Sequence, residues 1–158
     1  RSYRSSKNIA AFCSGLLVHE DKTIYLDREG SDPVIEDCVD EARMVVDINR
    51  KIGELCGKGN KSVAIICKTE RASIQLHEAL SGPTHVHLLT RKDVHYKQGV
   101  VVVPSYLAKG LEFDAVIVCC HGHNNYTEEA ERNLFYTVCS RALHDLEVLY
   151  TGAKPLFL

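Results

Sequence analysis

Several features that would point at once to a function are missing from this chain of 158 residues. No apolar run is long enough to cross a membrane, and the first residues carry no signal-peptide pattern, so we expect a cytoplasmic protein without a membrane partner. The sequence has no internal repeat and no low-complexity segment. Its net charge of −2 excludes a strong overall attraction to nucleic-acid phosphates, although a local basic groove remains compatible with it.

The seven cysteines lack the pattern of a disulfide scaffold or a zinc site. Their number is odd, no CxxC occurs, and most lie inside apolar segments. Cys119 and Cys120 have His121 and His123 nearby, but adjacent residues of a strand point to opposite faces, which is poor geometry for binding one ion. We therefore expect buried, reduced thiols and no metal site.

A phosphate-binding loop is also missing. The stretch GELCGKGNKS resembles one superficially, but a Walker A motif needs four residues between its glycines and Ser or Thr after its lysine. Here three residues separate Gly53 from Gly57, and Gly59 follows Lys58. The stretch also comes after an expected helix rather than a strand. We predict that it ends this helix, so that the chain lacks the main cradle for a triphosphate.

What the sequence does contain is a regular alternation of apolar strands and amphipathic helices. The expected strands cover 62–67, 84–89, 100–103, 115–120 and 147–150, with a further short strand at 23–26. The expected helices begin near Lys7, with Ser5 or Ser6 as the cap, after the acidic stretch Glu36–Glu41, near Ala72, and near Thr127, which can cap the last helix. Helical spacing places Ile74 on the inward face of the third helix and Ala142 on the apolar stripe of the fourth. Strands that are apolar throughout are typical of a parallel sheet buried on both faces. The prediction is an α/β fold, a mostly parallel sheet with helices on both faces, in one domain over residues 1–158.

The stretch Pro104–Cys120 stands out because a short polar loop precedes its apolar strand. The loop brings together a cation, a flexible backbone point and a carboxylate, at Lys109, Gly110 and Glu112. In α/β proteins, loops at the edge of the sheet are where ligands bind. This loop is therefore a candidate binding site.

Three stretches, in this order, resemble motifs of superfamily 1 helicases of the UvrD, Rep and PcrA type. SYRSS at 2–6 resembles motif IV, PSYLAKGLEFDAVIV at 104–118 resembles motif V, and EAERNLFYTVCSRAL at 129–143 resembles motif VI. The segment 62–80 is similar to the strand, loop and helix between them. The resemblance implies the second RecA-like domain, called 2A, of a longer ATP-dependent DNA helicase or translocase. This P-loop-NTPase-type domain has no P-loop of its own, so ATP and its Mg²⁺ would be held mainly by the first RecA-like domain.

A finer similarity is to the HelD-type branch of these enzymes. The string PSYLAKGLEFDAVI is most similar to that branch, and the connection between Leu80 and Val100 is short. The short connection implies that the 2B insertion of UvrD-type enzymes is absent. The alternative function is therefore an interaction module that docks on RNA polymerase and has little unwinding activity.

The resemblance also assigns catalytic and ATP-binding residues. Arg4 and Arg141 would point across a cleft and stabilise the charge that develops on the transferred phosphate. Glu112 would accept a hydrogen bond from the ribose, and Gly110 would let the backbone approach the nucleotide. Judged from position alone, Arg4 could equally be a solvated arginine, and Arg141 could pair with a neighbouring carboxylate.

Four residues are candidates for contact with single-stranded DNA. Lys68 and Thr69 match a segment that contacts the nucleic-acid backbone in relatives, and Ser105 and Tyr106 belong to motif V. Such contacts would be independent of base sequence and sensitive to salt. Tyr106 stands where many relatives have a histidine, but an aromatic ring could stack on a base. The alternative for all four residues is an ordinary polar loop.

Overall fold

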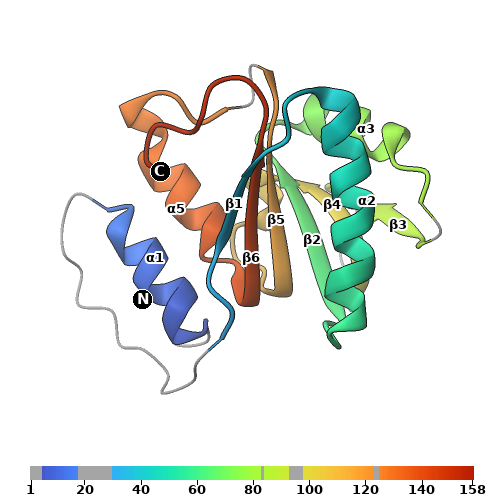
Figure 1. Cartoon of the computed structure of the whole chain (residues 1–158), viewed down its shortest axis with the longest axis horizontal. Helices are drawn as coiled ribbons and strands as arrows, with labels where there is room; N and C mark the ends of the chain where they lie inside the picture. Colours follow the sequence, from blue (N-terminus) through green and yellow to red (C-terminus); the bar gives the residue numbers. More distant parts are fainter. Residues whose placement is uncertain (1–4, 18–29, 83, 93–97, 123–124) are drawn as a thin grey trace.

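Six parallel strands form a single sheet in the order β1-β6-β5-β2-β4-β3 (Figure 1). The computed structural model describes residues 5–17, 30–82, 84–92, 98–122 and 125–158. The strands are β1 Val34–Asp37, β2 Ser62–Cys67, β3 Val86–Leu88, β4 Gly99–Pro104, β5 Phe113–Cys120 and β6 Ala142–Tyr150. The helices are α1 Lys7–Gly15, α2 Glu41–Gly57, α3 Glu70–Ala79, α4 Ser105–Ala108 and α5 Arg132–Cys139, with a 3₁₀ turn η2 at Glu129–Glu131.

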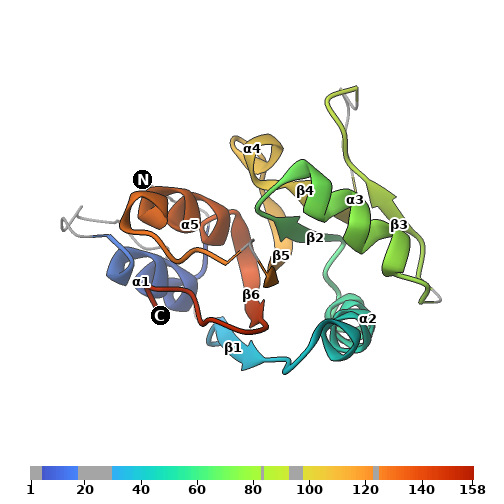
Figure 2. The same ribbon diagram turned by 90° about the horizontal axis from the view of Figure 1, so that it is seen from above.

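Helices cover both faces of this sheet, as the sequence predicts. Figure 2 shows α1 and α5 on one side of the strands, and α2 and α3 on the other. Each strand sends alternate side chains into the two layers: Ile66 of β2 packs in the layer with Ile9 of α1, and Ile65 packs with Ile48 of α2. This alternation explains why the central strands are apolar throughout, because neither face meets water.

The register places the ends of neighbouring strands side by side. Cys67 at the end of β2 pairs with Pro104 of β4 on one side and with Cys119 of β5 on the other. All strands run the same way, so their carboxyl ends form one edge of the sheet and their amino ends form the opposite edge. The loops at these two edges carry the candidate site residues.

Helix α2 begins and ends where the sequence indicates. The side chain of Asp40 accepts a hydrogen bond from the Arg43 N–H and caps the first turn. The glycine-containing stretch that superficially resembles a phosphate loop forms the end of this helix and the turn into β2, with Gly59 at φ +97°. The prediction that this stretch ends a helix is confirmed.

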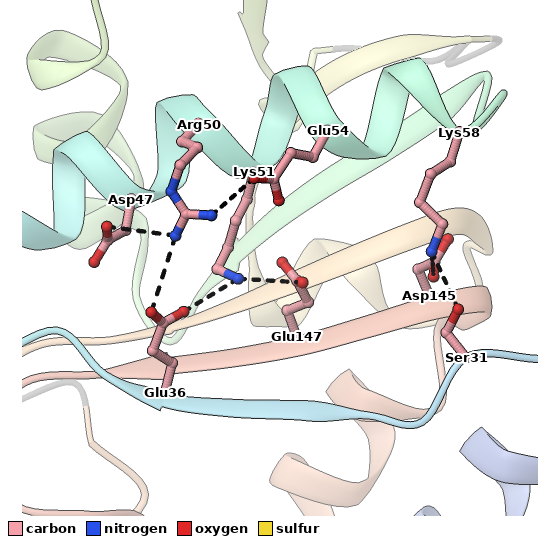
Figure 3. A network of polar contacts seen from close by, with 9 residues as sticks. All are labelled: Ser31, Glu36, Asp47, Arg50, Lys51, Glu54, Lys58, Asp145 and Glu147. Atoms are coloured by element: carbon pink, nitrogen blue, oxygen red, sulfur yellow. Dashed lines mark hydrogen bonds and ion pairs between the residues drawn. The ribbon is translucent and has the colours of Figure 1, made fainter.

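A network of charged side chains lies between α2 and the first two strands of the sheet (Figure 3). The Nζ of Lys51 is 3.1 Å from an oxygen of Glu36 on β1 and 3.2 Å from an oxygen of Glu147 on β6. Only 6% of the Lys51 side chain is exposed, so the ammonium group depends on these carboxylates. The network therefore ties α2 to the edge strand.

One strand has no counterpart among the predictions, and two local predictions are wrong. The acidic stretch before α2 contains strand β1, which pairs with β6 through Glu36 and Asp37. The last helix ends at Cys139, so Ala142 is not on its apolar stripe but begins β6, a strand longer than the expected one. Ile74 of α3, expected to face inward, is 41% exposed. Strand pairing outweighs local polarity at β1, because a partner strand satisfies its backbone.

Helix caps also differ from expectation in detail. Ser6 is the N-cap of α1, but its side chain makes no capping hydrogen bond. The turn before α5 is capped by Glu128 and Glu131, which form a reciprocal capping box, rather than by Thr127. The expected strand at 23–26 lies outside the described residues. Within the described part of the chain, no helix is both long enough and apolar enough to span a membrane.

Candidate functional site

The motif V stretch connects the two edges of the sheet. Strand β4 ends at Pro104 on the carboxyl edge, where α4 begins, and β5 starts at Phe113 on the amino edge. The residues between them run back along the sheet, so Ser105 and Tyr106 belong to the carboxyl edge. Gly110 and Glu112 belong to the amino edge. The candidate residues therefore divide into two separate surfaces.

Arg141 lies directly against the Gly110–Glu112 loop on the amino edge. The N–H of Phe113 donates to the carbonyl of Arg141 at 3.0 Å, and Nη1 of Arg141 donates to the carbonyl of Leu111 at 3.4 Å. The guanidinium also donates to the carbonyl of Thr137 and to the hydroxyl of Ser140, at 3.0 and 3.2 Å. These contacts hold a half-buried arginine at the end of α5 with donors left for a ligand.

The backbone of the Gly110–Glu112 loop has a conformation that lets a ligand come close to it. Gly110 has φ +86°, a left-handed backbone that a side chain would strain, and no atom lies within 4 Å of where a Cβ would be. Glu112 is exposed beside it. The structure thus brings Gly110, Glu112 and Arg141 together. We call this group the amino-edge rim.

Arg4 lies outside the described residues. The residues that follow it are bonded to the start of β6: the Ser5 hydroxyl donates to the carbonyl of Ala142 at 2.7 Å, and the Ser6 N–H donates to the carbonyl of Leu143 at 2.8 Å. These bonds attach the chain directly after Arg4 to the residues directly after Arg141. The role of Arg4 remains a prediction.

On the carboxyl edge, two of the predicted DNA-binding residues make structural hydrogen bonds. The Ser105 hydroxyl is buried and donates to the carbonyl of Lys68 at 2.7 Å. The Thr69 hydroxyl is the N-cap of α3 and accepts from the Ala72 N–H at 3.1 Å. Both residues shape the loops between strands β2 and β4 and their helices.

Lys68 is engaged with its own neighbours. Its ammonium group forms an ion pair with Glu131 and lies 5.7 Å from the centre of the Tyr126 ring. Burial would raise the pKa of Glu131, but hydrogen bonds from Lys68 and from backbone N–H groups outweigh it and hold that pKa below its ordinary value. The half-buried lysine thus links the end of β2 to the turn before α5.

Tyr106 is 40% exposed and has a partner that the sequence did not reveal. The Nε of Arg91 donates to the Tyr106 hydroxyl at 3.3 Å, and the guanidinium carbon lies 5.0 Å from the ring centre. Arg91 follows β3 and is far from Tyr106 in sequence. Only the pairing of β3 with β4 brings them together, so no local pattern could have found this contact.

The cysteines have the properties that the sequence predicts. All seven are free, and only Cys56 is not buried. Burial raises the pKa of Cys13 and of Cys38 to about 12, which keeps both as neutral thiols. Among the described residues, no group of three or more His, Cys, Asp or Glu side chains could hold a metal ion.

Comparison with known proteins agrees with the resemblance to UvrD-type helicases. A family model for the UvrD-like helicase C-terminal domain matches residues 99–149, which include the amino-edge rim. The crystal structure of the C-terminal domain of a possible DNA helicase from Lactobacillus plantarum WCFS1 is similar, with 35% identity and a TM-score of 0.82. The match covers 98% of this chain and 91% of that chain. No curated protein matches the chain.

Proposed function

The chain belongs to the UvrD-like helicase C-terminal domains, and from this premise we propose that it is the second RecA-like motor domain of an ATP-dependent DNA helicase or translocase in the cytoplasm. Its amino-edge rim would complete an ATP cleft whose other wall is the first RecA-like domain of the same polypeptide. The observation that carries the proposal is the contact of Arg141 with the Gly110–Glu112 loop.

The residues present fit the part of the nucleotide site assigned to them. The Arg141 guanidinium retains N–H donors for phosphate oxygens, Glu112 is an exposed acceptor for a ribose hydroxyl, and Gly110 leaves open space beside the backbone. Bound ATP would supply the phosphoryl group, with Mg²⁺ held mainly by the first domain. The contribution of this chain is to place positive charge where the phosphate develops negative charge, and to orient the ribose.

The decisive test is Arg141→Ala in the full-length protein. A transition-state arginine is worth roughly a thousandfold or more in kcat, so DNA-stimulated ATP hydrolysis should fall by about that factor. Arg141→Lys keeps the charge but not the planar fork, and it should restore little of the activity. Steady-state kinetics give kcat, and thermal unfolding shows whether the variants fold.

The matched control is Arg71→Ala, which removes an exposed arginine from α3 on the opposite side of the sheet from the rim. This variant should hydrolyse ATP at the wild-type rate. If folded Arg141→Ala also retained wild-type kcat, Arg141 would have no role in catalysis and the proposed cleft would be wrong.

The finer assignment to the HelD-type branch is also part of the proposal. Among the described residues between α3 and β4, β3 is the only strand or helix, and the short connection between Leu80 and Val100 leaves no room for a 2B-sized domain there. This supports an alternative in which the full-length protein remodels RNA polymerase rather than unwinding DNA. Release of stalled RNA polymerase without duplex unwinding would favour the alternative, and unwinding without release would favour the helicase.

A further inference from the structure

We infer that Arg91 binds the backbone of single-stranded DNA at the carboxyl edge, and that it does so as a unit with Tyr106. No motif points to Arg91, because it follows the short strand β3 outside every stretch that resembles a helicase motif. The inference rests on the proposed function, since it concerns how the same motor domain holds its nucleic acid. The inference identifies Arg91 as the cation that contacts a DNA phosphate.

The geometry of the pair carries the first step. Arg91 is exposed, its Nε donates to the Tyr106 hydroxyl at 3.3 Å, and its guanidinium carbon is 5.0 Å from the ring centre. This contact uses the Nε proton. No acceptor for either terminal NH₂ group is found in the described part of the chain. The tyrosine thus orients the guanidinium and leaves its two outer nitrogens for a phosphate.

The second step is a comparison with the cation that the sequence suggested. Lys68 is neutralised by Glu131, and only 22% of its side chain is exposed. A phosphate that binds Lys68 would have to displace the Glu131 carboxylate. A phosphate that binds Arg91 displaces only water, because this guanidinium is exposed. Among the described residues, the carboxylate that acts on Arg91 is Glu70 at the start of α3, through its charge and without a hydrogen bond. Arg91 is therefore the better placed of the two.

The third step concerns the aromatic ring. Tyr106 is 40% exposed, so part of its face can meet a base while the guanidinium meets the adjoining phosphate. Aromatic rings and guanidinium planes both stack on bases without regard to sequence. A motor that moves along a strand needs this kind of contact, because it must accept every base. The pair combines charge and stacking at a single position.

The test measures binding of the chain to two fluorescent oligomers over a range of salt concentrations. One is an oligothymidylate, and the other is an abasic strand with the same number of phosphates. Arg91→Ala should weaken binding to both strands by about tenfold at low salt, and should reduce the slope of log K against log salt by about 0.7. Tyr106→Leu should weaken binding to the oligothymidylate by about fivefold or more and leave abasic binding nearly unchanged.

Two further variants make the result specific. Arg91→Lys keeps the charge and should preserve the salt slope while losing part of the affinity. Lys61→Ala removes the same charge from an exposed position on the opposite edge of the sheet, and should have only a small effect. Because Arg91 is on the surface, thermal unfolding of each variant should match the wild type.

The outcomes separate the two proposals. If the wild-type chain binds neither strand in a salt-dependent way, both this inference and the nucleic-acid part of the proposed function are overturned. If the wild type binds but Arg91→Ala behaves like Lys61→Ala, only the inference is overturned, and the pair is a surface cation–π contact without a ligand.

Discussion

Among individual residues, Asp145 shows how a buried carboxylate is kept charged in this protein. It lies on β6, where Lys58 donates to Oδ1 at 2.6 Å (Figure 3). Asn60 donates to Oδ2 at 2.9 Å. Burial would raise the pKa of Asp145, but these hydrogen bonds outweigh it, and the pKa lies below its ordinary value of 3.8. The charged form is therefore the one that stabilises the fold.

This balance predicts the pH dependence of stability. A folded-state pKa that is lowered contributes stability above pH 3.8, and this contribution is lost as the pH falls below that value through the folded pKa. Asp145→Asn should cost about 2 kcal/mol at neutral pH, because two charge-assisted hydrogen bonds are weakened. In urea unfolding experiments, the difference in unfolding free energy between Asp145→Asn and the wild type should shrink below pH 3.8.

The control for this prediction is Glu78→Gln, which changes an exposed carboxylate on α3 and should alter stability little at any pH. If the unfolding free energies of Asp145→Asn and the wild type differed by the same amount across the acid range, the charge of Asp145 would not contribute to stability.

At the scale of elements, the attachment of α2 to the edge strand β1 depends on a charged side chain rather than on apolar packing alone. Val34 and Ile35 of β1 are 41% and 40% exposed, so this strand buries little of its own apolar surface. Lys51 instead reaches from α2 to Glu36 on β1 and to Glu147 on β6. Burial raises the pKa of Glu147, and Lys51 opposes that rise.

Lys51→Met should therefore destabilise the fold by about 3 kcal/mol, because it leaves Glu147 buried without its cation. The double variant Lys51→Met with Glu147→Gln should recover part of this loss, since no buried charge then remains. Chemical unfolding of the single and double variants gives both values. Glu54→Gln removes an exposed ion pair with Arg50 in the same network and should cost less than about 1 kcal/mol. Equal losses in the single and double variants would contradict the argument.

For the molecule as a whole, the two edges of one sheet separate two tasks. The amino-edge rim carries the residues proposed for the nucleotide, and the carboxyl edge carries those proposed for the nucleic acid. The buried strands β4 and β5 run between the two edges, and the motif V segment links the end of one to the start of the other. A nucleotide and a strand of DNA bound at these surfaces would therefore be joined by a rigid core, as a motor requires.

The division of labour predicts that this chain alone does not hydrolyse ATP. Its glycine-containing stretch is the end of α2, and the rim offers one arginine and one carboxylate without a triphosphate cradle. The isolated chain should show only background phosphate release in the presence of Mg²⁺, with or without single-stranded DNA. Hydrolysis at the rate of a complete motor, retained after repeated purification, would show that the chain contains a full catalytic site.

The sequence by itself determined the parallel sheet, the helices on both faces and the candidate residues of motifs V and VI. It could do so because apolar runs and motif spacing are local properties of the chain. Only the tertiary structure decided that the acidic stretch before α2 includes an edge strand. It also decided that Lys68 forms an ion pair with Glu131 and that Arg91 donates a hydrogen bond to Tyr106. Each of these depends on contacts between segments distant in sequence, which the register of the strands creates and no local pattern records.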